Sequence, residues 1–173
     1  NGKGAPVRLS PMDQAGTHYY EISPLAKFGR HLFSNARTPR MEEWITLPDH
    51  KAIDPANSIA ETLKRVKPAA QNIEFFRVTT EDGVEVDAWM VKPDNFDPNK
   101  KYPIVFTVYG EAAGSTVLDT YGTGRNRLYE GSMAADGYIY ASMDNRGTPS
   151  PKGRAWRKAI YRSIGTINIQ DMA

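Results

Sequence analysis

The chain has 173 residues, enough for one good-sized domain or for parts of two. A formal net charge of +2 is too weak to indicate nucleic-acid binding without a basic cluster, and 40% hydrophobic with 24% charged residues is ordinary for a globular protein. The absence of cysteine excludes disulfides and thiolate metal sites. The sequence contains no run of about 18 or more apolar residues, so no membrane-spanning helix is predicted. The sequence begins without an initiator Met or a secretory signal, and we expect it to be a piece of a longer protein.

Residues 1–52 are predicted to form short strands joined by polar turns. Asn1-Gly2-Lys3-Gly4 is a hairpin signal, and 7–9 is expected as the end of a strand. Further strands are expected at 17–22, 28–34 and 44–47. Short strands at such close, regular spacing predict a β-meander, for example one blade of a β-propeller. One blade cannot bury both of its faces, so neighbouring blades are implied.

A connecting helix is predicted next. Ser58 followed three residues later by Glu61 is a capping-box signature. The helix is expected to end at about Lys67, because Pro68 cannot continue it. We interpret residues 53–72 as the connection between two domains.

From residue 73 onward, strand patterns alternate with helical ones. The predicted strands are 75–80, 84–91, 104–108 and 138–143, and the predicted helices are 126–135, 153–162 and one that starts at 168. Asp82-Gly83 is a strong hairpin turn between the first two strands. Alternation of this kind predicts an α/β domain over 73–173, with a parallel sheet and helices on its faces.

The strand at 104–108 carries the candidate site. Its run Ile-Val-Phe-Thr-Val predicts a strand that is buried on both faces, and it leads directly into Tyr109-Gly110. In open α/β sheets, ligands and catalytic groups collect beyond the carboxyl ends of the strands, which makes Tyr109 a candidate site residue. By spacing alone, the simpler interpretation of Tyr109 is a core tyrosine with a hydrogen-bonded hydroxyl.

Several apparent motifs predict no chemistry. Gly122-Thr123-Gly124 lacks the preceding strand and the third glycine of a dinucleotide fingerprint. His18, His31 and His50 are far apart in sequence and share no ligand spacing, so no metal site is expected from them. The basic residues between 146 and 162 are interpreted as the solvated face of an amphipathic helix rather than as a nucleic-acid site.

The motifs of a serine hydrolase are missing or open to two interpretations. No Gly-x-Ser-x-Gly occurs and no histidine follows the α/β segment, so this chain cannot complete a Ser-Asp-His triad. Asp144 and Arg146 follow a predicted buried strand, where a catalytic role is open. We prefer a buried ion pair that holds a loop.

Two blocks of the sequence resemble the dipeptidyl peptidase IV branch of the prolyl oligopeptidase (S9) family of serine peptidases. The first block covers 79–90, 96–103 and Val108-Tyr109-Gly110-Glu111, and the second covers 144–148, 158–161 and 170–171. A looser resemblance over 1–52 rests on Thr17-His18, Ile22-Ser23-Pro24 and Phe33-Ser34-Asn35. Ala112-Ala113 departs from the family pattern, in which a proline follows the glutamate.

The resemblance implies an eight-bladed propeller and an α/β-hydrolase domain, with 1–52 as the end of the propeller and 73–173 as the N-terminal half of the peptidase domain. It implies a serine exopeptidase that releases N-terminal dipeptides, with Pro or Ala at the penultimate position, through an acyl-enzyme. In that family, the tyrosine that matches Tyr109 donates its hydroxyl to the oxyanion hole. The catalytic Ser, Asp and His are then expected after Ala173, and the acidic residues that bind the substrate amine before Asn1.

The same resemblance implies partners and a location. The implied partners are peptides with a free N-terminus and the remainder of the parent chain, a homodimer of the parent is left open, and no cofactor or metal is expected. The parent is expected in the periplasm or outside the cell. The alternative is a non-catalytic relative that keeps the scaffold as an interaction module, and a Gly-x-Ser-x-Gly after Ala173 would separate the two hypotheses.

Overall fold

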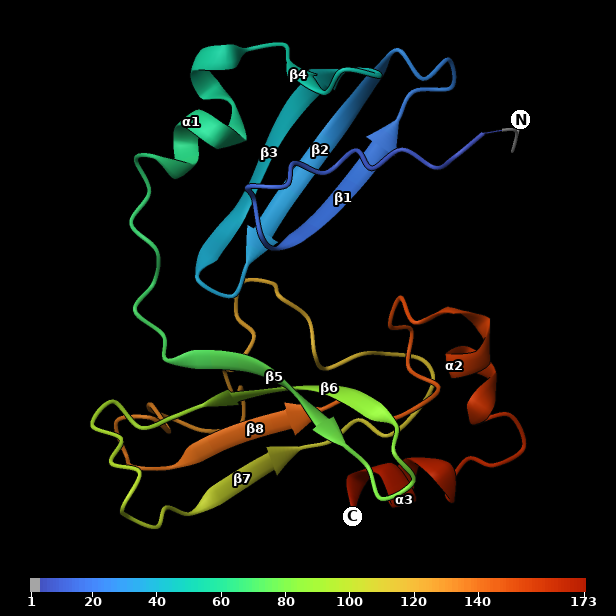
Figure 1. Cartoon of the computed structure of the whole chain (residues 1–173). Helices are drawn as coiled ribbons and strands as arrows, with labels where there is room; N and C mark the ends of the chain where they lie inside the picture. The colour runs from blue at the N-terminus through green and yellow to red at the C-terminus, as the bar shows by residue number, and fades with distance from the viewer. Residues whose placement is uncertain (1–3) are drawn as a thin grey trace. The chain divides into compact units, whose positions relative to one another are not determined.

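The computed structural model describes residues 4–173, and the chain forms two compact units (Figure 1). The first unit is Asn1–Ala69 together with Asp119–Tyr121, and the second is Ala70–Leu118 with Gly122–Ala173. The hairpin expected at 1–4 rests on residues outside the described part of the chain. Each unit has one sheet of four strands.

The sheet of the first unit is an antiparallel meander, as predicted. Its strands lie in chain order: β1 (Thr17–Ile22), β2 (Phe28–Asn35), β3 (Thr38–Thr46) and β4 (Lys51–Ala52). Two predictions fail here, because residues 7–9 form no strand and β3 begins six residues before the expected strand. The early part of β3 is rich in charge and has no apolar alternation. It forms because β2 lies beside it to pair with, from Asn35↔Thr38 onward.

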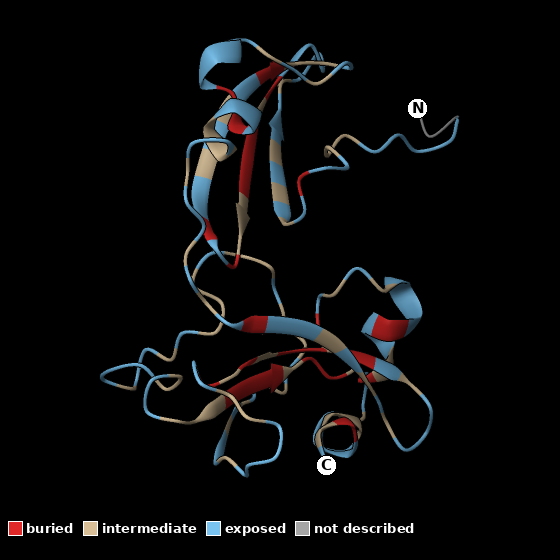
Figure 2. Cartoon of the chain, turned by 60° about the vertical axis from the view of Figure 1, so that its left-hand side comes forward, coloured by how far each residue is buried: buried red, intermediate tan, exposed pale blue. Residues whose placement is uncertain are grey.

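Buried residues of the first unit concentrate along β2 (Figure 2). Phe33 and Ile45 are almost fully buried, and Ile59 of α1 (Ile59–Leu63) joins them. This helix follows a short 3₁₀ helix, η1 (Pro55–Asn57), and ends four residues before its predicted end. The Ser58 hydroxyl accepts a hydrogen bond from the Glu61 N–H at 3.3 Å, which confirms the predicted cap.

The sheet of the second unit is mixed rather than parallel. Its order is β5 (Ile73–Thr79), β6 (Glu85–Val91), β8 (Ile139–Met143) and β7 (Ile104–Thr107). Only β7 and β8 run parallel, while β6 is antiparallel to both β5 and β8. The tight turn at Asp82-Gly83, where Gly83 has φ +82°, forces β5 and β6 into an antiparallel hairpin.

The strand β8 is the buried centre of this sheet, whereas β7 is its edge (Figure 2). Ile104 is 53% exposed and Phe106 is 60% exposed, so the prediction of a strand buried on both faces is wrong for β7 in this chain. The apolar run indicates that the strand is stable only when other residues cover both of its faces. It does not supply the residues that would cover it.

Two of the three predicted helices form. These are α2 (Gly153–Ala159), three residues shorter than predicted, and α3 (Ile167–Met172). Trp156 of α2 and Ile160, one turn further along, are both buried. Residues 126–135 form turns instead of a helix, because the chain passes through Gly131 with φ +125°, a conformation outside the helical region.

Candidate functional site

Tyr109 lies two residues beyond the carboxyl end of β7. It is 49% exposed, and its hydroxyl has no hydrogen-bond partner among residues 4–173. A methyl group at Gly114 would lie 3.4 Å from Cε1 of Tyr109, so the ring rests against the next loop. Tyr109 is therefore not a buried core tyrosine. It presents a free phenolic O–H at the sheet edge where the parallel strands end.

A buried carboxylate fastens the loop that follows Tyr109. Asp144, directly after β8, accepts hydrogen bonds from the Thr116 N–H at 2.7 Å, the Thr116 hydroxyl at 3.0 Å and the Val117 N–H at 3.3 Å. Trp89 Nε1–H donates to the Thr116 carbonyl at 2.9 Å. The loop is thus tied both to β8 and to β6, which limits the positions open to the Tyr109 ring.

The predicted ion pair between Asp144 and Arg146 does not form. Arg146 instead binds Asp171 of α3, with Nη2 to Oδ1 at 2.5 Å, and Asp82 of the β5–β6 turn at 2.7 Å. The Asp171 side chain is fully buried, and its hydrogen bonds, followed by that of Asp82, raise the pKa of Arg146. A buried ion pair does hold this loop, but the partners come from two distant elements that local sequence could not indicate.

Asn145, directly after Asp144, is a buried polar residue that the sequence analysis did not single out. It is 1% exposed, and its amide N–H donates to the Arg146 carbonyl at 2.6 Å. Its amide oxygen has no hydrogen-bond partner among the described residues. A buried polar atom without a partner is uncommon and marks a place where another group can bind. The only sequence signal is a polar residue at the end of a buried strand.

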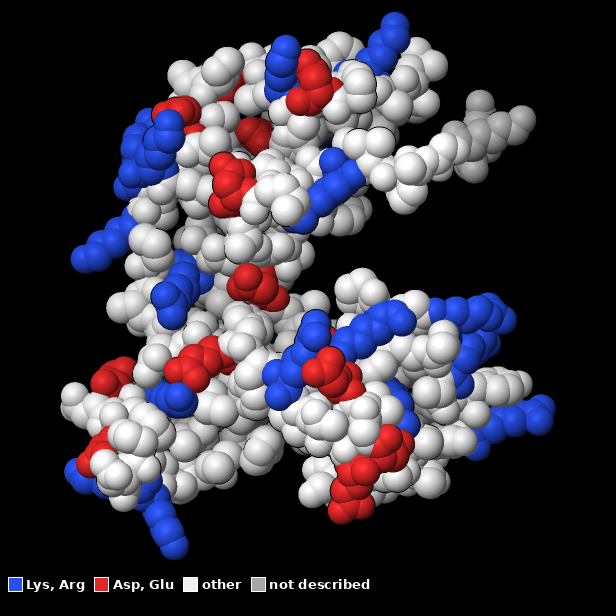
Figure 3. Space-filling view, viewed as in Figure 1, with Lys and Arg blue, Asp and Glu red and all other residues white. Residues whose placement is uncertain are grey.

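The basic residues around α2 are only partly a solvated face. Lys152 binds Asp87 at 3.0 Å and lies 4.5 Å from the centre of the Trp156 ring. Arg157 donates to the Ala112 carbonyl at 2.9 Å and to the Gly147 carbonyl at 2.6 Å. Figure 3 shows Lys and Arg gathered over α2, with acidic side chains nearby in the same unit. The interpretation as a solvated face is therefore wrong for Arg146 and Lys152, whose side chains are 13% and 23% exposed, whereas Arg157 is exposed as predicted.

Comparison with known proteins identifies what this arrangement resembles. No protein-family model matches the chain. Over 156 residues, 88% of this chain, it is 30% identical to dipeptidyl peptidase 4 of Trichophyton equinum and equally to that of Trichophyton rubrum. The crystal structure of Porphyromonas gingivalis dipeptidyl peptidase 4 matches 96% of this chain with a TM-score of 0.73 and 29% identity. The chain is homologous to a segment of the dipeptidyl peptidase 4 proteins.

The family resemblance seen in the sequence is thereby confirmed. The chain spans 20% of the length of these dipeptidyl peptidase 4 relatives and 23% of the crystallised one. Within residues 4–173, no helix has the length and apolar composition needed to cross a bilayer.

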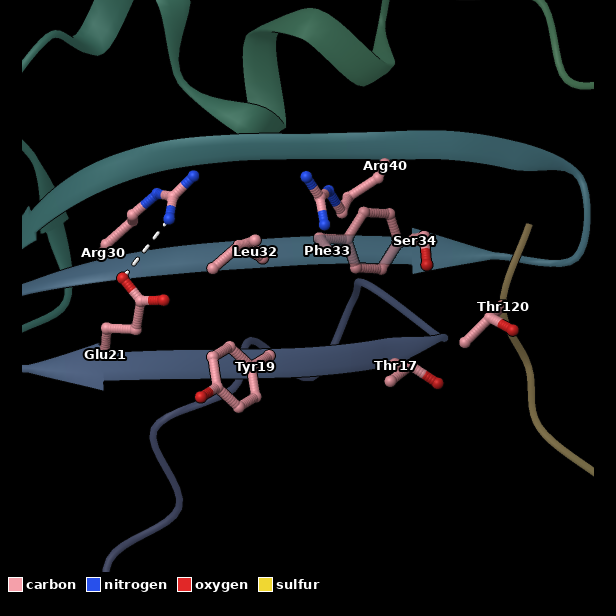
Figure 4. Close-up of a pocket in the computed structure, with 9 residues that line it drawn as sticks. All are labelled: Thr17, Tyr19, Glu21, Arg30, Leu32, Phe33, Ser34, Arg40 and Thr120. Atoms are coloured by element: carbon pink, nitrogen blue, oxygen red, sulfur yellow. Dashed lines mark hydrogen bonds and ion pairs between the residues drawn. The ribbon is translucent and has the colours of Figure 1, made fainter. Parts of the chain in front are cut away.

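The first unit of this dipeptidyl peptidase 4 homologue has an open pocket of about 330 Å³ on its sheet (Figure 4). Tyr19 lies in it and is 60% exposed. Arg30 stands between Glu21 at 3.3 Å and Glu42 at 2.5 Å, so its charge is already compensated. Among the described residues that line the pocket, the one carboxylate, Glu21, is paired with Arg30. We regard it as sheet surface rather than as a reaction site.

The three histidines of the first unit come together in space although they are far apart in the sequence. His18 Nδ1 and His31 Nε2 are 2.8 Å apart, and the rings of His31 and His50 meet edge to face at 4.8 Å. Their spacing in the sequence predicted no metal site and gave no sign that the rings would lie together. The pairing of β1 with β2 and the turn before β4 bring together residues that are 13 to 32 positions apart in sequence.

Proposed function

We propose that this chain is part of a serine-type dipeptidyl peptidase that removes dipeptides from free N-termini, with Pro or Ala at the penultimate position. The homology to dipeptidyl peptidase 4 proteins supports the reaction class. In this proposal, 1–52 is the last propeller blade, 53–72 the connection and 73–173 the N-terminal half of an α/β-hydrolase domain. The four-stranded meander has the form of a propeller blade, and the β-hairpin followed by parallel strands and helices suits the second assignment.

The proposal assigns the remaining machinery to parts of the parent protein outside this chain. These parts supply the Ser-Asp-His triad, which forms the acyl-enzyme, and the acidic residues that bind the substrate amine. The parent then acts in the periplasm or outside the cell, and homodimer formation is a further point to test. No cofactor takes part in this reaction.

The observation that carries the proposal is the position of Tyr109. Attack on a peptide carbonyl creates an oxyanion, and a donor aimed at that oxygen stabilises the transition state more than the ground state. The Tyr109 hydroxyl is free among the described residues. Asp144 and Arg157 hold the loop after Tyr109 through Thr116, Val117 and Ala112. A donor restrained in this way is preorganised for the oxyanion.

The decisive experiment replaces Tyr109 by Phe in the full-length protein. The ring remains and only the donor is lost, so kcat should fall about 100- to 1,000-fold, equal to roughly 2.7 to 4 kcal/mol. KM should change much less, because the ground-state carbonyl does not depend on this hydrogen bond. The matched control is Tyr161→Phe, at an exposed tyrosine just beyond α2, which should leave kcat unchanged. A kcat within about threefold of wild type removes Tyr109 from the active site.

Labelling with a fluorophosphonate probe separates the enzyme from a non-catalytic scaffold. The full-length protein should be labelled at one serine, while this chain alone should not be labelled, because it has no Gly-x-Ser-x-Gly. A full-length protein that resists the probe would favour the interaction module. Labelling of the isolated chain would contradict the assignment of the nucleophile to another part of the parent.

A further inference from the structure

A buried polar cluster in the first unit is independent of the Tyr109 site. His31 of β2 is fully buried and lies opposite Glu43 of β3, with its Nδ1 2.8 Å from Glu43 Oε1. The other nitrogen of His31 faces His18 Nδ1 at 2.8 Å, and His18 Nε2 faces the Gln14 carbonyl at 2.8 Å. These three contacts form one continuous chain of hydrogen bonds.

With both imidazoles neutral and Glu43 ionised, these three hydrogen bonds lack one proton. Three hydrogen bonds require three protons, whereas two neutral imidazoles and a carboxylate hold only two. The Gln14 carbonyl can only accept, so the neutral form of His18 carries its proton on Nε2 and accepts from His31 at Nδ1. His31 then turns the lone pair of its Nδ1 toward the Glu43 carboxylate. Two acceptors 2.8 Å apart need a cation between them, either a proton or a metal ion.

Glu43 is ready to serve as an anionic ligand. Burial raises the pKa of Glu43, but a hydrogen bond from His31, when Nδ1 carries the shared proton, and one from the Ile59 N–H offset this and hold the pKa below its ordinary value. The Ile59 N–H donates to Oε2 at 3.0 Å, which fixes the orientation of the carboxylate. The other oxygen of Glu43, Oε1, then points toward His31 and toward the proton or metal ion between them.

His50 supplies a third ligand. One ring nitrogen of each of His31 and His50 and one oxygen of Glu43 all lie within 4.8 Å of one another. Ligand atoms around a tetrahedral zinc ion are about 3.3 Å apart, so only small side-chain shifts are required. His50 has a left-handed backbone, with φ +52°, and the Tyr20 hydroxyl lies 3.0 Å from its Nε2. Outer hydrogen bonds of this kind orient metal-binding imidazoles.

The cluster opens onto a cavity of about 480 Å³ that Glu43, His50, Ser58 and Gln14 help to line. Gln14 is only 9% exposed, and its amide oxygen has no hydrogen-bond partner among residues 4–173. A water molecule on the open coordination position of a metal ion could donate a hydrogen bond to this oxygen. The cavity therefore provides both access for an ion and a partner for its fourth ligand.

We propose that His31, Glu43 and His50 bind one divalent transition-metal ion of the zinc class, with a water as the fourth ligand. Two imidazoles and one carboxylate form a zinc ligand set, whereas calcium and magnesium prefer sites made of oxygen alone. Binding displaces the proton shared by His31 and Glu43, which passes to the solvent.

The test is a zinc titration of the full-length protein after removal of metals with a chelator. We expect one zinc ion per chain, with proton release detected by calorimetry in buffers of different ionisation enthalpy. Glu43→Gln and His50→Asn should each weaken zinc binding at least about tenfold. The matched control is Glu42→Gln, because Glu42 is adjacent on β3 but faces Arg30 on the other side of the sheet. This variant should bind zinc like the wild type.

A second readout covers variants that fail to fold. Cobalt(II) added to the wild-type protein should give the strong visible absorption of a four-coordinate ion, and zinc should abolish it. Melting curves without metal show which variants are folded and can be compared. The proposal is overturned if the wild type binds zinc with a Kd above about 1 mM or gives no four-coordinate cobalt spectrum. Equal zinc affinity in folded Glu43→Gln and Glu42→Gln variants overturns it as well.

Discussion

Gly147, in the loop after β8, presses directly on the side chain of Ile160. Its backbone has φ +95°, and a methyl group placed on it would lie 2.5 Å from Cγ2 of Ile160. Gly137 has a similar φ of +83°, but a methyl group there would meet nothing within 4 Å. The two glycines share the same backbone requirement and differ in the space around them.

We therefore predict that Gly147→Ala destabilises the protein by about 1 to 3 kcal/mol more than Gly137→Ala does. Both variants carry the strain of a left-handed alanine, and only Gly147→Ala adds a clash with a buried side chain. Urea denaturation of the two variants beside the wild type measures the difference. Equal losses would show that Ile160 moves aside at no cost.

Single residues were predictable from the sequence where the signal is local. Tyr109 follows a recognisable strand, and the sheet geometry then places it at a carboxyl end. The partner of Arg146 was not predictable, because Asp171 lies 25 positions further along and reaches it through the packing of α3. The same holds for the histidine cluster, which depends on strand register rather than on sequence spacing.

The β5–β6 hairpin is tied to the loop after β8 through its turn. Arg146 binds Asp82 at 2.7 Å. A hydrogen bond from the Thr80 hydroxyl, followed by that from Arg146, lowers the pKa of Asp82 below its ordinary value of 3.8. Because the folded state binds this proton less readily than the unfolded chain, the stabilisation is complete above the ordinary pKa. It is lost as the pH falls below that value through the lowered pKa.

We predict that Asp82→Asn lowers the melting temperature at neutral pH and that the difference from wild type shrinks as the pH falls below about 3.8. Melting temperatures of both proteins at several pH values measure this. The control is Asp94→Asn, which removes the same charge from an exposed position in the loop after β6. A difference that stays constant down to the lowest pH would contradict a role for the Asp82 charge.

Whole elements were predicted well where apolar alternation and turn residues agree. The strands β1, β2, β5, β6 and β8 lie within a few residues of their expected positions. The helix expected at 126–135 does not form, because Gly131 lies within that range and has a positive φ. The parallel sheet was predicted only in part. The Asp82-Gly83 turn predicted the β5–β6 hairpin, but nothing in the sequence indicated that β6 would pair antiparallel with β8.

At the scale of the whole chain, β7 is an open edge with apolar side chains in water. Ile104 and Phe106 are each more than half exposed, and β8 is the one strand that pairs with β7 among the described residues. An apolar edge strand with unpaired backbone groups is a site for association with other chains. In the proposed parent, the next strand of the hydrolase sheet would cover it.

We predict that the isolated 173-residue chain associates and lacks a sharp, reversible melting transition that is independent of concentration. Phe106→Lys should reduce association, because a lysine on an edge strand opposes pairing. The control is Leu128→Lys, at a loop residue that is 96% exposed. Sedimentation velocity at several concentrations measures the effect, and a well-behaved wild-type monomer would contradict it.

The pairing of His31 with Glu43 also limits how far β2 and β3 can slide past each other. A slip by one residue would turn the apolar face outward, but a slip by two would keep it inward, so burial alone cannot prevent the second error. After such a slip, Met41 or Ile45 would lie opposite His31 in place of Glu43. His31 and Glu43 would each lose a buried partner, at about 1 to 3 kcal/mol apiece. The His31–Glu43 pair therefore favours one register of β2 against β3 over others that would bury the same apolar face.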